Sequence, residues 1–237
     1  MKSCVFSPQS ILSHPSCTLL KKNKNQKRTE INNKHLSSPT PPVTHFIFHM
    51  HISHVVSSGF FYLRKIASVK KYLPANMLEN LVHAFISSRL DFGNSLFYGL
   101  PSIEINRLQK LQNQAARLLT GTRKYDHITP VLLRLHWLPV KQRIKFKILM
   151  FAFKAVNAIG PAYLQLPLQA PSRQTRANSA PTLKWKRSKK VTAGDRAFGV
   201  CAPQLWNALP NYIRCIDNFK DFKSNIKTFL FTEAFYS

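Results

Sequence analysis

Apolar residues recur at helical spacing in the middle of the chain, and a clear pattern of this kind lies between Ile103 and Leu119. Positions three, four and seven residues apart fall on the same face of an α-helix. The apolar positions with this spacing are Leu108, Leu111, Ala115, Leu118 and Leu119. Gly121 follows, and glycine commonly ends a helix in the left-handed conformation. The pattern therefore predicts an amphipathic helix that ends at Gly121.

Two more helices are expected before residue 160. Thr129 and Pro130 are typical of a helix start, and Pro139 must end the short segment that they begin. Pro139 also suits the first position of a third helix, which we expect from Val140 to Ala158 because apolar residues again recur at helical spacing. The three helices can bury their apolar faces only against one another, so we expect them to form the core.

Helical spacing also occurs upstream of this core. One helix is expected from Ile52 to Tyr72, and a second helix follows with Asn76 as its N-cap. Glu79 lies three residues after Asn76, which is the arrangement of a capping box. The residues expected to be buried in the second helix are Leu78, Leu81, Val82, Phe85 and Ile86.

The C-terminal part also contains apolar residues at helical spacing. Between residues 195 and 209 we expect Pro203 to break the segment, because proline removes a backbone donor. Trp206 is expected to be a core residue rather than a base-stacking surface, and a last helix is expected from Asp217. The sequence therefore predicts a mostly α fold, an irregular helical domain with little or no β structure.

Composition divides the chain into four segments. Residues 1–48 are expected to be a disordered basic tail, because Ser, Asn, Lys and Pro are in excess there. Residues 49–160 form the expected helical core, residues 161–193 a basic linker, and residues 194–237 a C-terminal helical segment.

The net charge favours a particular class of partner. The chain has 35 Lys and Arg residues against 9 Asp and Glu residues, which gives a formal net charge of +26. Such an excess favours RNA or DNA, because basic side chains that neutralise phosphates release counterions. The alternative is a basic protein whose charge serves no selected partner.

The sequence also indicates the cellular compartment of the protein. Four cysteines without a CxxC pair or a secretory signal indicate reduced thiols, and no apolar run reaches the roughly 18 residues of a transmembrane helix. We therefore expect an intracellular protein, nuclear or cytoplasmic, that does not act at a membrane. The tail has a cluster that resembles a nuclear-localisation signal or a solvated charge run: Lys21, Lys22, Lys24, Lys27 and Arg28.

Three groups of basic residues are candidate phosphate ligands. The first two groups lie along the central helices and comprise Arg107, Lys110 and Arg117, then Arg143, Lys147 and Lys154. The third group is Lys184, Trp185, Lys186, Arg187, Lys189 and Lys190. An aromatic among basic residues is typical of single-strand binding. The alternatives are ordinary solubilising charge and, for the third group, an edge strand protected by lysines.

No residue pattern indicates catalysis. A two-metal phosphoryl-transfer site needs clustered carboxylates, and here the acidic residues are scattered. Asp217 and Asp221 share a helix face, but the positive end of that helix explains them. The histidines between residues 45 and 54 have no cysteine or carboxylate near them in the sequence, so we do not interpret them as a zinc site. We expect no catalytic residue, metal, cofactor or small-molecule substrate.

Four long runs of the sequence resemble a known family. They are HISHVVSSGFFYLRKIASVKKYL (51–73), LVHAFISSRLDFGNSLFYGLP (81–101), RLQKLQNQAARLLTGTRKYDHITPVLLRLHWLPVKQRIKFKILMFAFKAVN (107–157) and GDRAFGVCAPQLWNALPNYIR (194–214). All four are similar to the C-terminal part of reverse transcriptases from non-LTR, LINE-type retrotransposons. That part follows the polymerase palm and comprises the thumb and the region beyond it.

The resemblance implies nucleic-acid binding without catalysis. In that family the polymerase aspartates and the endonuclease domain lie upstream of the part resembled here, and this chain has no Asp-Asp pair. The thumb and the region beyond it are expected to hold template, primer and element RNA. We therefore expect a non-catalytic, thumb-like fragment. The alternatives are a mobile-element relic without function and a protein-interaction module, with a reverse transcriptase as one partner, that uses the apolar face left by the missing palm.

Overall fold

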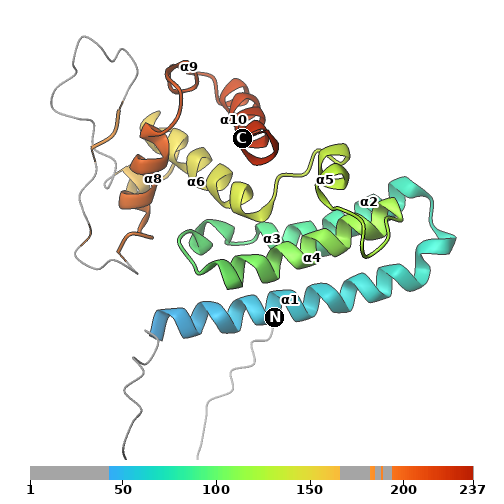
Figure 1. The fold of residues 1–237 in the computed structure, drawn as a ribbon. Helices are drawn as coiled ribbons and strands as arrows, with labels where there is room; N and C mark the ends of the chain where they lie inside the picture. Colours follow the sequence, from blue (N-terminus) through green and yellow to red (C-terminus); the bar gives the residue numbers. More distant parts are fainter. Residues whose placement is uncertain (1–42, 166–181, 185–187, 189–193, 237) are drawn as a thin grey trace, which may run out of the picture. The chain divides into compact units, whose positions relative to one another are not determined.

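The computed structural model describes residues 43–165, 182–184, 188 and 194–236, and most of these residues are helical (Figure 1). The mostly α fold predicted from the sequence is confirmed. The helices are α1 (Val43–Val69), η1 (Lys70–Tyr72), α2 (Ala75–Val82), η2 (His83–Ser87), α3 (Ser88–Asp91), η3 (Asn94–Phe97), α4 (Ser102–Thr120), α5 (Thr129–Arg134), α6 (Val140–Val156), α7 (Ala162–Gln165), α8 (Phe198–Asn207), α9 (Asn211–Arg214) and α10 (Phe219–Phe235). Within the described ranges, no helix combines the length and the apolar character needed to cross a bilayer.

The long helices α1 and α4 lie side by side (Figure 1). Their close approach depends on Gly59 in α1, because a Cβ atom there would lie 2.4 Å from Leu111 Cδ2 in α4. Leu111 is fully buried, so it has little room to move. The continuous helical run α2–η2–α3 contacts both long helices. These elements therefore form the N-terminal layer of the fold.

Two glutamines of α4 hold the start of α6. The first N–H groups of a helix need acceptors from outside the helix, and Pro139, which precedes α6, supplies no side-chain cap. Gln109 Oε1 accepts a hydrogen bond from Val140 N at 2.8 Å. Gln112, which is fully buried, donates through Nε2 to Leu138 O at 2.8 Å. Gln109, 31 positions earlier in the chain, thus caps the first N–H of α6, and Gln112 fixes the backbone just before the helix.

Helix α6 carries the C-terminal helices α8 and α10. Phe153 of α6 stacks on Phe222 of α10 with ring centroids 4.3 Å apart. Phe222 also stacks on Trp206 of α8 at 5.7 Å. Trp206 is almost completely buried, so its predicted place in the core is confirmed.

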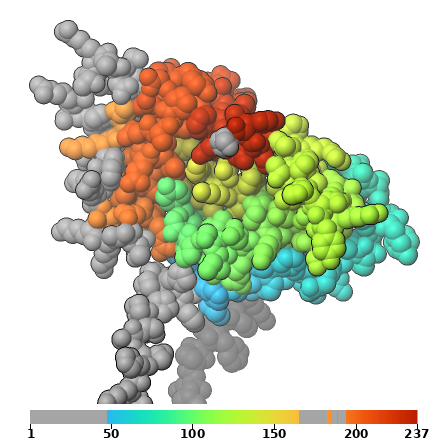
Figure 2. Space-filling model, viewed as in Figure 1, coloured from blue at the N-terminus to red at the C-terminus, as the bar shows by residue number. Residues whose placement is uncertain are grey.

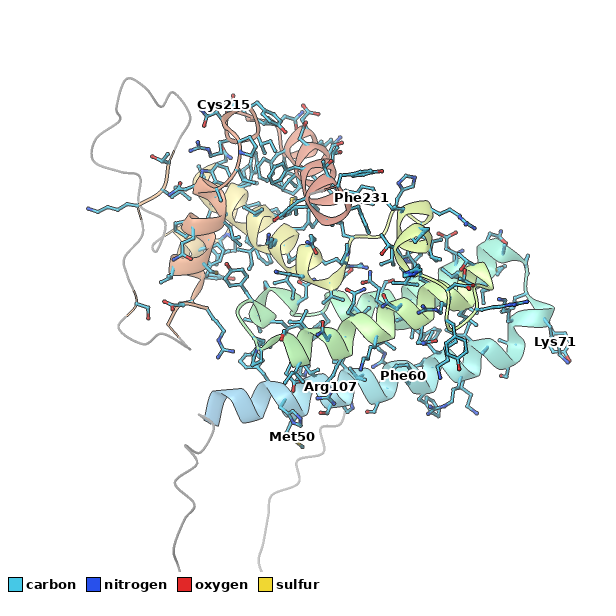
Figure 3. All side chains as sticks on the ribbon, viewed as in Figure 1. Met50, Phe60, Lys71, Arg107, Cys215 and Phe231 are labelled. Atoms are coloured by element: carbon cyan, nitrogen blue, oxygen red, sulfur yellow. The ribbon has the colours of Figure 1, made fainter. Side chains whose placement is uncertain are left out.

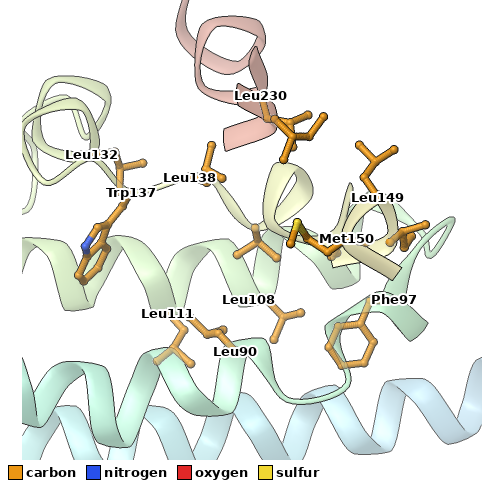
Figure 4. Packing of buried hydrophobic residues seen from close by; sticks show 14 of the residues in the cluster. Leu90, Phe97, Leu108, Leu111, Leu132, Trp137, Leu138, Leu149, Met150 and Leu230 are labelled. Carbon is orange, nitrogen blue, oxygen red and sulfur yellow. The ribbon is translucent and has the colours of Figure 1, made fainter. Parts of the chain in front are cut away.

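The helices before residue 160 and those after residue 194 share one hydrophobic core. The cluster of buried side chains includes Leu108 and Leu149 from the first part and Leu230 from the second (Figure 4). Figure 2 shows α1 in blue and cyan, the central helices in green and the C-terminal helices in orange and red, following one another across one face. Residues 49–160 and 194–237, which the composition assigns to different segments, therefore pack together.

Helix α1 begins at Val43, so it includes the last residues of the segment 1–48 that was expected to be a tail. Two prolines precede Val43 in the sequence, and proline favours the positions around a helix start. Phe48 packs edge-on against Phe97, with ring centroids 6.4 Å apart, which gives this end of α1 a tertiary contact. Residues 1–42, including the basic cluster of the tail, lie outside the described part of the chain.

The capping box expected from Asn76 and Glu79 is also wrong. Helix α2 begins at Ala75, and no side chain caps it. Pro74 has an extended conformation, with ψ at 156°, and its carbonyl accepts from Leu78 N at 3.1 Å. The N-cap is therefore Pro74, two residues earlier than the pattern predicts, and Asn76 lies in the first turn of the helix.

The last helix also begins later than expected. Helix α10 starts at Phe219, and Asn218 caps it by accepting from Lys220 N at 3.0 Å. Asp217, the expected start, lies just outside the helix. An amide oxygen can serve as an N-cap as well as a carboxylate can, so the sequence alone did not separate the two neighbours.

Residues with positive φ follow three central helices. Gly121 ends α4 with φ at 72°, and its N–H donates to Arg117 O at 2.9 Å, which confirms the predicted C-cap. His136 has φ at 52° shortly after α5, which ends at Arg134, so Trp137 lies outside the helix. Ala158 has φ at 54° two residues after α6 ends, which places Ala158 outside the helix.

The middle of the α2–α3 run is a π-helical turn, η2. The buried residues Leu78, Val82, Ile86 and Leu90 follow one another at intervals of four. In an α-helix each such step drifts by about 40° around the axis, and the wider π turn takes up that drift. Phe85, which was expected to be buried, is 38% exposed. The sequence-based prediction assumed a regular α-helix and was wrong for this residue.

Helix α8 runs through Pro203, so the break expected there is wrong. A proline inside a helix loses one backbone hydrogen bond and crowds the preceding turn. In this protein Cys201, Ala202, Pro203 and Trp206 are all buried, and α8 packs on α6. We attribute the continuous helix to this packing, because tertiary burial outweighs the local preference.

Candidate nucleic-acid interface

A groove between α1 and α4 gathers basic side chains from both helices and from the loop after α4. Its volume is about 500 Å³, and we call it the α1–α4 groove. It is lined by Phe60, Leu63, Arg64, Ala67, Lys110, Gln114, Arg117, Leu118, Thr122 and Lys124. Figure 3 shows Phe60 pointing from α1 towards α4. Within the described part of the chain, the lining contains four cations and no carboxylate, so the groove suits an anionic ligand.

The cations of this groove differ in their contacts. Arg64, Lys110 and Lys124 are exposed, and no carboxylate of the described residues pairs with them. Arg117 instead donates to two loop carbonyls, Arg123 O at 3.2 Å and Asp126 O at 2.8 Å. Arg117 therefore shapes the wall of the groove, and the three exposed cations face solvent.

Arg107, the first predicted phosphate ligand on α4, has partners within the protein. Its Nη1 donates to Glu104 Oε2 at 3.0 Å, and its Nη2 donates to Ser53 Oγ at 2.8 Å. Glu104 is buried, and His49 Nε2 lies 3.8 Å from its other oxygen. Arg107 lies between α1 and α4 (Figure 3). These contacts favour the structural interpretation of Arg107, which holds the two helices together.

A second basic cavity lies where α6 meets α10 and α3. We call it the α6–α10 cleft; its volume is about 330 Å³. It is lined by His83, Asp91, Asn94, His136, Trp137, Leu138, Arg143, Phe146, Lys147, Lys223 and Lys227. Arg143 binds Asp91 through two hydrogen bonds, Nε to Oδ1 at 2.9 Å and Nη2 to Oδ2 at 2.6 Å. This geometry ties α6 to α3 and neutralises part of the positive charge in the cleft.

The other predicted ligands on the C-terminal side lie apart from one another. Lys147 is exposed in the α6–α10 cleft, with its Nζ 5.7 Å from the Phe151 ring centroid. Lys154 Nζ lies 5.0 Å from the Phe219 ring centroid, also in a cation–π contact. Lys184 is exposed and follows Leu183, whose backbone N and O bond the Asn207 side chain at 2.9 and 2.8 Å. Trp185, Lys186, Arg187, Lys189 and Lys190 lie outside the described residues.

Carboxylates in the described part of the chain pair with particular cations rather than gathering at one place. The ion pairs are Glu104 with Arg107 and His49, Asp91 with Arg143, Glu233 with Lys145, and Glu79 with His83. Nor do the described residues bring three or more His, Cys, Asp or Glu side chains together as metal ligands. Three of these pairs link different helices, namely Glu104 with His49, Asp91 with Arg143, and Glu233 with Lys145.

Among the residues that the structure describes, two titratable groups have clearly shifted pKa values, and neither lies in the basic cavities. Burial raises the pKa of the Cys201 thiol to about 11, and backbone hydrogen bonds oppose this only in part. Burial also raises the pKa of Tyr98, and the neighbouring Cys201 adds to that shift. Both groups are thus held in their neutral forms. A cysteine in this state is a poor nucleophile.

Sequence reasoning missed four basic residues of the two cavities: Arg64, Lys124, Lys223 and Lys227. Arg64 and Lys110 lie on helices that are distant in the sequence, and the close α1–α4 contact brings them to one groove. A stripe on one helix can be predicted from its own spacing, but a groove needs the partner helix. No sequence signal could therefore have linked these residues.

Comparisons of the chain with protein-family models, with curated proteins and with solved structures found no match.

Proposed function

We propose that this protein binds RNA or DNA by phosphate contacts in the α1–α4 groove, as a non-catalytic relative of the C-terminal part of a retrotransposon reverse transcriptase. The resemblance of four sequence runs supports this relationship, and the net charge of +26 supports a polyanionic partner. The proposal includes an intracellular location, nuclear or cytoplasmic. It assigns no reaction, metal or cofactor to the chain.

The observation that carries the proposal is the composition of the α1–α4 groove. Three exposed cations, Arg64, Lys110 and Lys124, converge on it, and its lining contains no carboxylate. Clustered like charges repel one another, so a polyanion that neutralises them gains affinity. Arg143 and Arg107 are weaker candidates, because internal carboxylates already neutralise them.

The test measures the affinity of the full-length chain for labelled RNA and duplex DNA over a series of salt concentrations. The groove variant carries Arg64→Gln, Lys110→Gln and Lys124→Gln. Each lost phosphate contact should reduce the slope of log K against log salt by roughly 0.7–0.9. The slope should therefore fall by about two units, and affinity at low salt should fall by at least about tenfold.

The control variant removes the same charges elsewhere, through Arg134→Gln, Lys141→Gln and Lys220→Gln, all at exposed positions. It should retain nearly all the affinity, because these residues lie outside both basic cavities. Equal losses in the two variants would mean that binding follows net charge alone. Absence of salt-dependent binding in the parent chain would favour a relic without function.

A further inference from the structure

Aromatic rings from α1 and η2 form an exposed stack on a flank of α1. The Tyr62 and Phe85 rings lie nearly parallel, with centroids 5.0 Å apart and an interplanar angle of 20°. Phe61 meets Tyr62 edge-on at 5.4 Å. Phe61 is 48% exposed and Phe85 is 38% exposed. We call these three residues the aromatic strip. Burial of large aromatic side chains stabilises a fold, so a group of them that stays exposed indicates a binding site.

Two cations lie close to rings of the aromatic strip. The Arg89 guanidinium lies 4.6 Å from the Tyr62 ring centroid, and Lys65 Nζ lies 5.7 Å from the Phe61 centroid. No carboxylate of the described residues pairs with either cation. Next to the strip is a hollow of about 460 Å³ that also contains Arg89, together with His51, His54 and Phe92, and its lining has no acidic residue.

The backbone places Phe85 in this strip by an uncommon turn. Phe85 lies in the π turn η2, and the neighbouring Ile86 is buried while Phe85 faces solvent. Turns of this type are rare and occur frequently at functional sites. The π turn therefore serves two purposes, because it keeps the buried stripe of α2–α3 in register and it presents an aromatic ring outward.

We propose that the aromatic strip stacks unpaired bases of single-stranded RNA or DNA while the α1–α4 groove binds the phosphates, an inference that rests on the proposed function. Around the α1 axis, Phe61 lies about 60° and Tyr62 about 160° from Arg64, which lines the groove. A helix with its side chains is about 10–12 Å wide, so a flexible single strand that wraps part of the way around α1 reaches both surfaces. Bases in a duplex are already stacked and paired, and the strip therefore favours single strands.

Charge complementarity favours a single-stranded nucleic acid as the ligand of the aromatic strip over a second copy of the chain or another protein. A second copy of the chain, related by two-fold symmetry, would bring two cation-bearing strips together, and like charges that face each other across an interface are unfavourable. Lysine is depleted at the centre of protein–protein interfaces, whereas here Lys65 Nζ lies 5.7 Å from the Phe61 ring centroid. Aromatic rings with interleaved cations match the combination that binds single strands without sequence preference.

The test compares single-stranded RNA and duplex DNA of equal length, with the full-length chain. The strip variant carries Phe61→Leu and Phe85→Leu, which keep apolar volume and remove the rings. A control variant carries Tyr212→Leu and Tyr236→Leu, two exposed aromatic residues outside the strip. Thermal melts followed by circular dichroism check that all variants remain folded.

The strip variant should bind single-stranded RNA about tenfold or more weakly, with duplex affinity and both salt slopes unchanged. The control variant should bind like the parent, and Phe61→Tyr should retain single-strand affinity because a ring remains. Unchanged single-strand affinity, or an equal loss on duplex, would overturn the inference while leaving phosphate binding in the groove intact. Self-association of the parent that the strip variant abolishes, with unchanged RNA binding, would assign the strip to a second copy. Absence of salt-dependent binding in the parent would overturn the inference together with the proposed function.

Discussion

The α1–α4 groove and the α6–α10 cleft are both basic, but their cations have different contacts. In the groove, Arg117 donates to backbone carbonyls and Lys110 faces solvent. In the cleft, Arg143 makes a two-point ion pair with Asp91, which lies 52 residues earlier in the chain. The groove has no carboxylate in its lining, whereas the cleft has one directly on its arginine.

This difference shows that a basic stripe does not by itself indicate a binding surface. The stripes on α4 and α6 have similar compositions in the sequence, and both were candidates for phosphate contact. A carboxylate supplied by another helix turns Arg143 into a link between α6 and α3. Cations without such a partner remain available to an external anion. The contacts of each cation therefore decide its role.

The largest loss of stability is expected where α10 packs on α6 and α8. Phe222→Ala should lower the free energy of unfolding by about 3–5 kcal/mol, because Phe222 is completely buried between Phe153 and Trp206. Chemical denaturation measures the loss, and Phe229→Ala, at a partly exposed position of the same helix, should cost clearly less. Similar losses in the two variants would show that the aromatic stack does not hold α10 on α6.

A larger side chain at Gly59, where α1 packs on α4, should disturb the α1–α4 groove. Gly59→Val should destabilise the protein by about 1–3 kcal/mol, because its side chain would overlap Leu111 and push α1 from α4. Phosphate binding in the groove should weaken in the same variant. Ser57→Val is the matched control, since it places the same β-branched residue at an exposed position of α1. If both variants lost equal stability, helix propensity rather than close packing would be the cause.

The ion pair of the cleft should be measurable by a double-mutant cycle. Arg143→Ala, Asp91→Ala and the double variant should give a coupling energy of about 1 kcal/mol, because solvent screens a pair whose side chains are 20% and 41% exposed. Lys110→Ala should change stability by less than about 0.5 kcal/mol. A coupling near zero would remove the distinction between the cleft and the groove.

The smallest effect is expected from pH. The raised pKa of Cys201, about 11, means that the unfolded thiol loses its proton first as pH rises. The unfolded state then binds fewer protons, so stability falls with rising pH, by less than about 1 kcal/mol up to pH 9. Cys201→Ala should reduce this dependence, and Cys215→Ala, at an exposed cysteine, should not. An unchanged pH profile in Cys201→Ala would show that the Cys201 thiol does not cause the pH dependence of stability.

Several features of the fold followed from local patterns, and the exceptions have specific causes. The predicted C-cap at Gly121 and the buried position of Trp206 are confirmed. The predictions failed where packing outweighed local preference, as at Pro203 inside α8, and where a π turn replaced an α turn, as at Phe85. In both cases the deciding contacts come from residues outside the local sequence window.

The sequence by itself determined that the chain is mostly helical and which faces of α4 and α6 are apolar, because both follow from a periodicity of 3.6 residues within one element. Only the tertiary structure decided which cations act together. Arg64 meets Lys110 in one groove because α1 packs on α4, and Arg143 meets Asp91 because α6 packs near α3. A charge has no fixed role in a linear sequence, since its free energy depends on the groups that folding brings within a few ångströms of it.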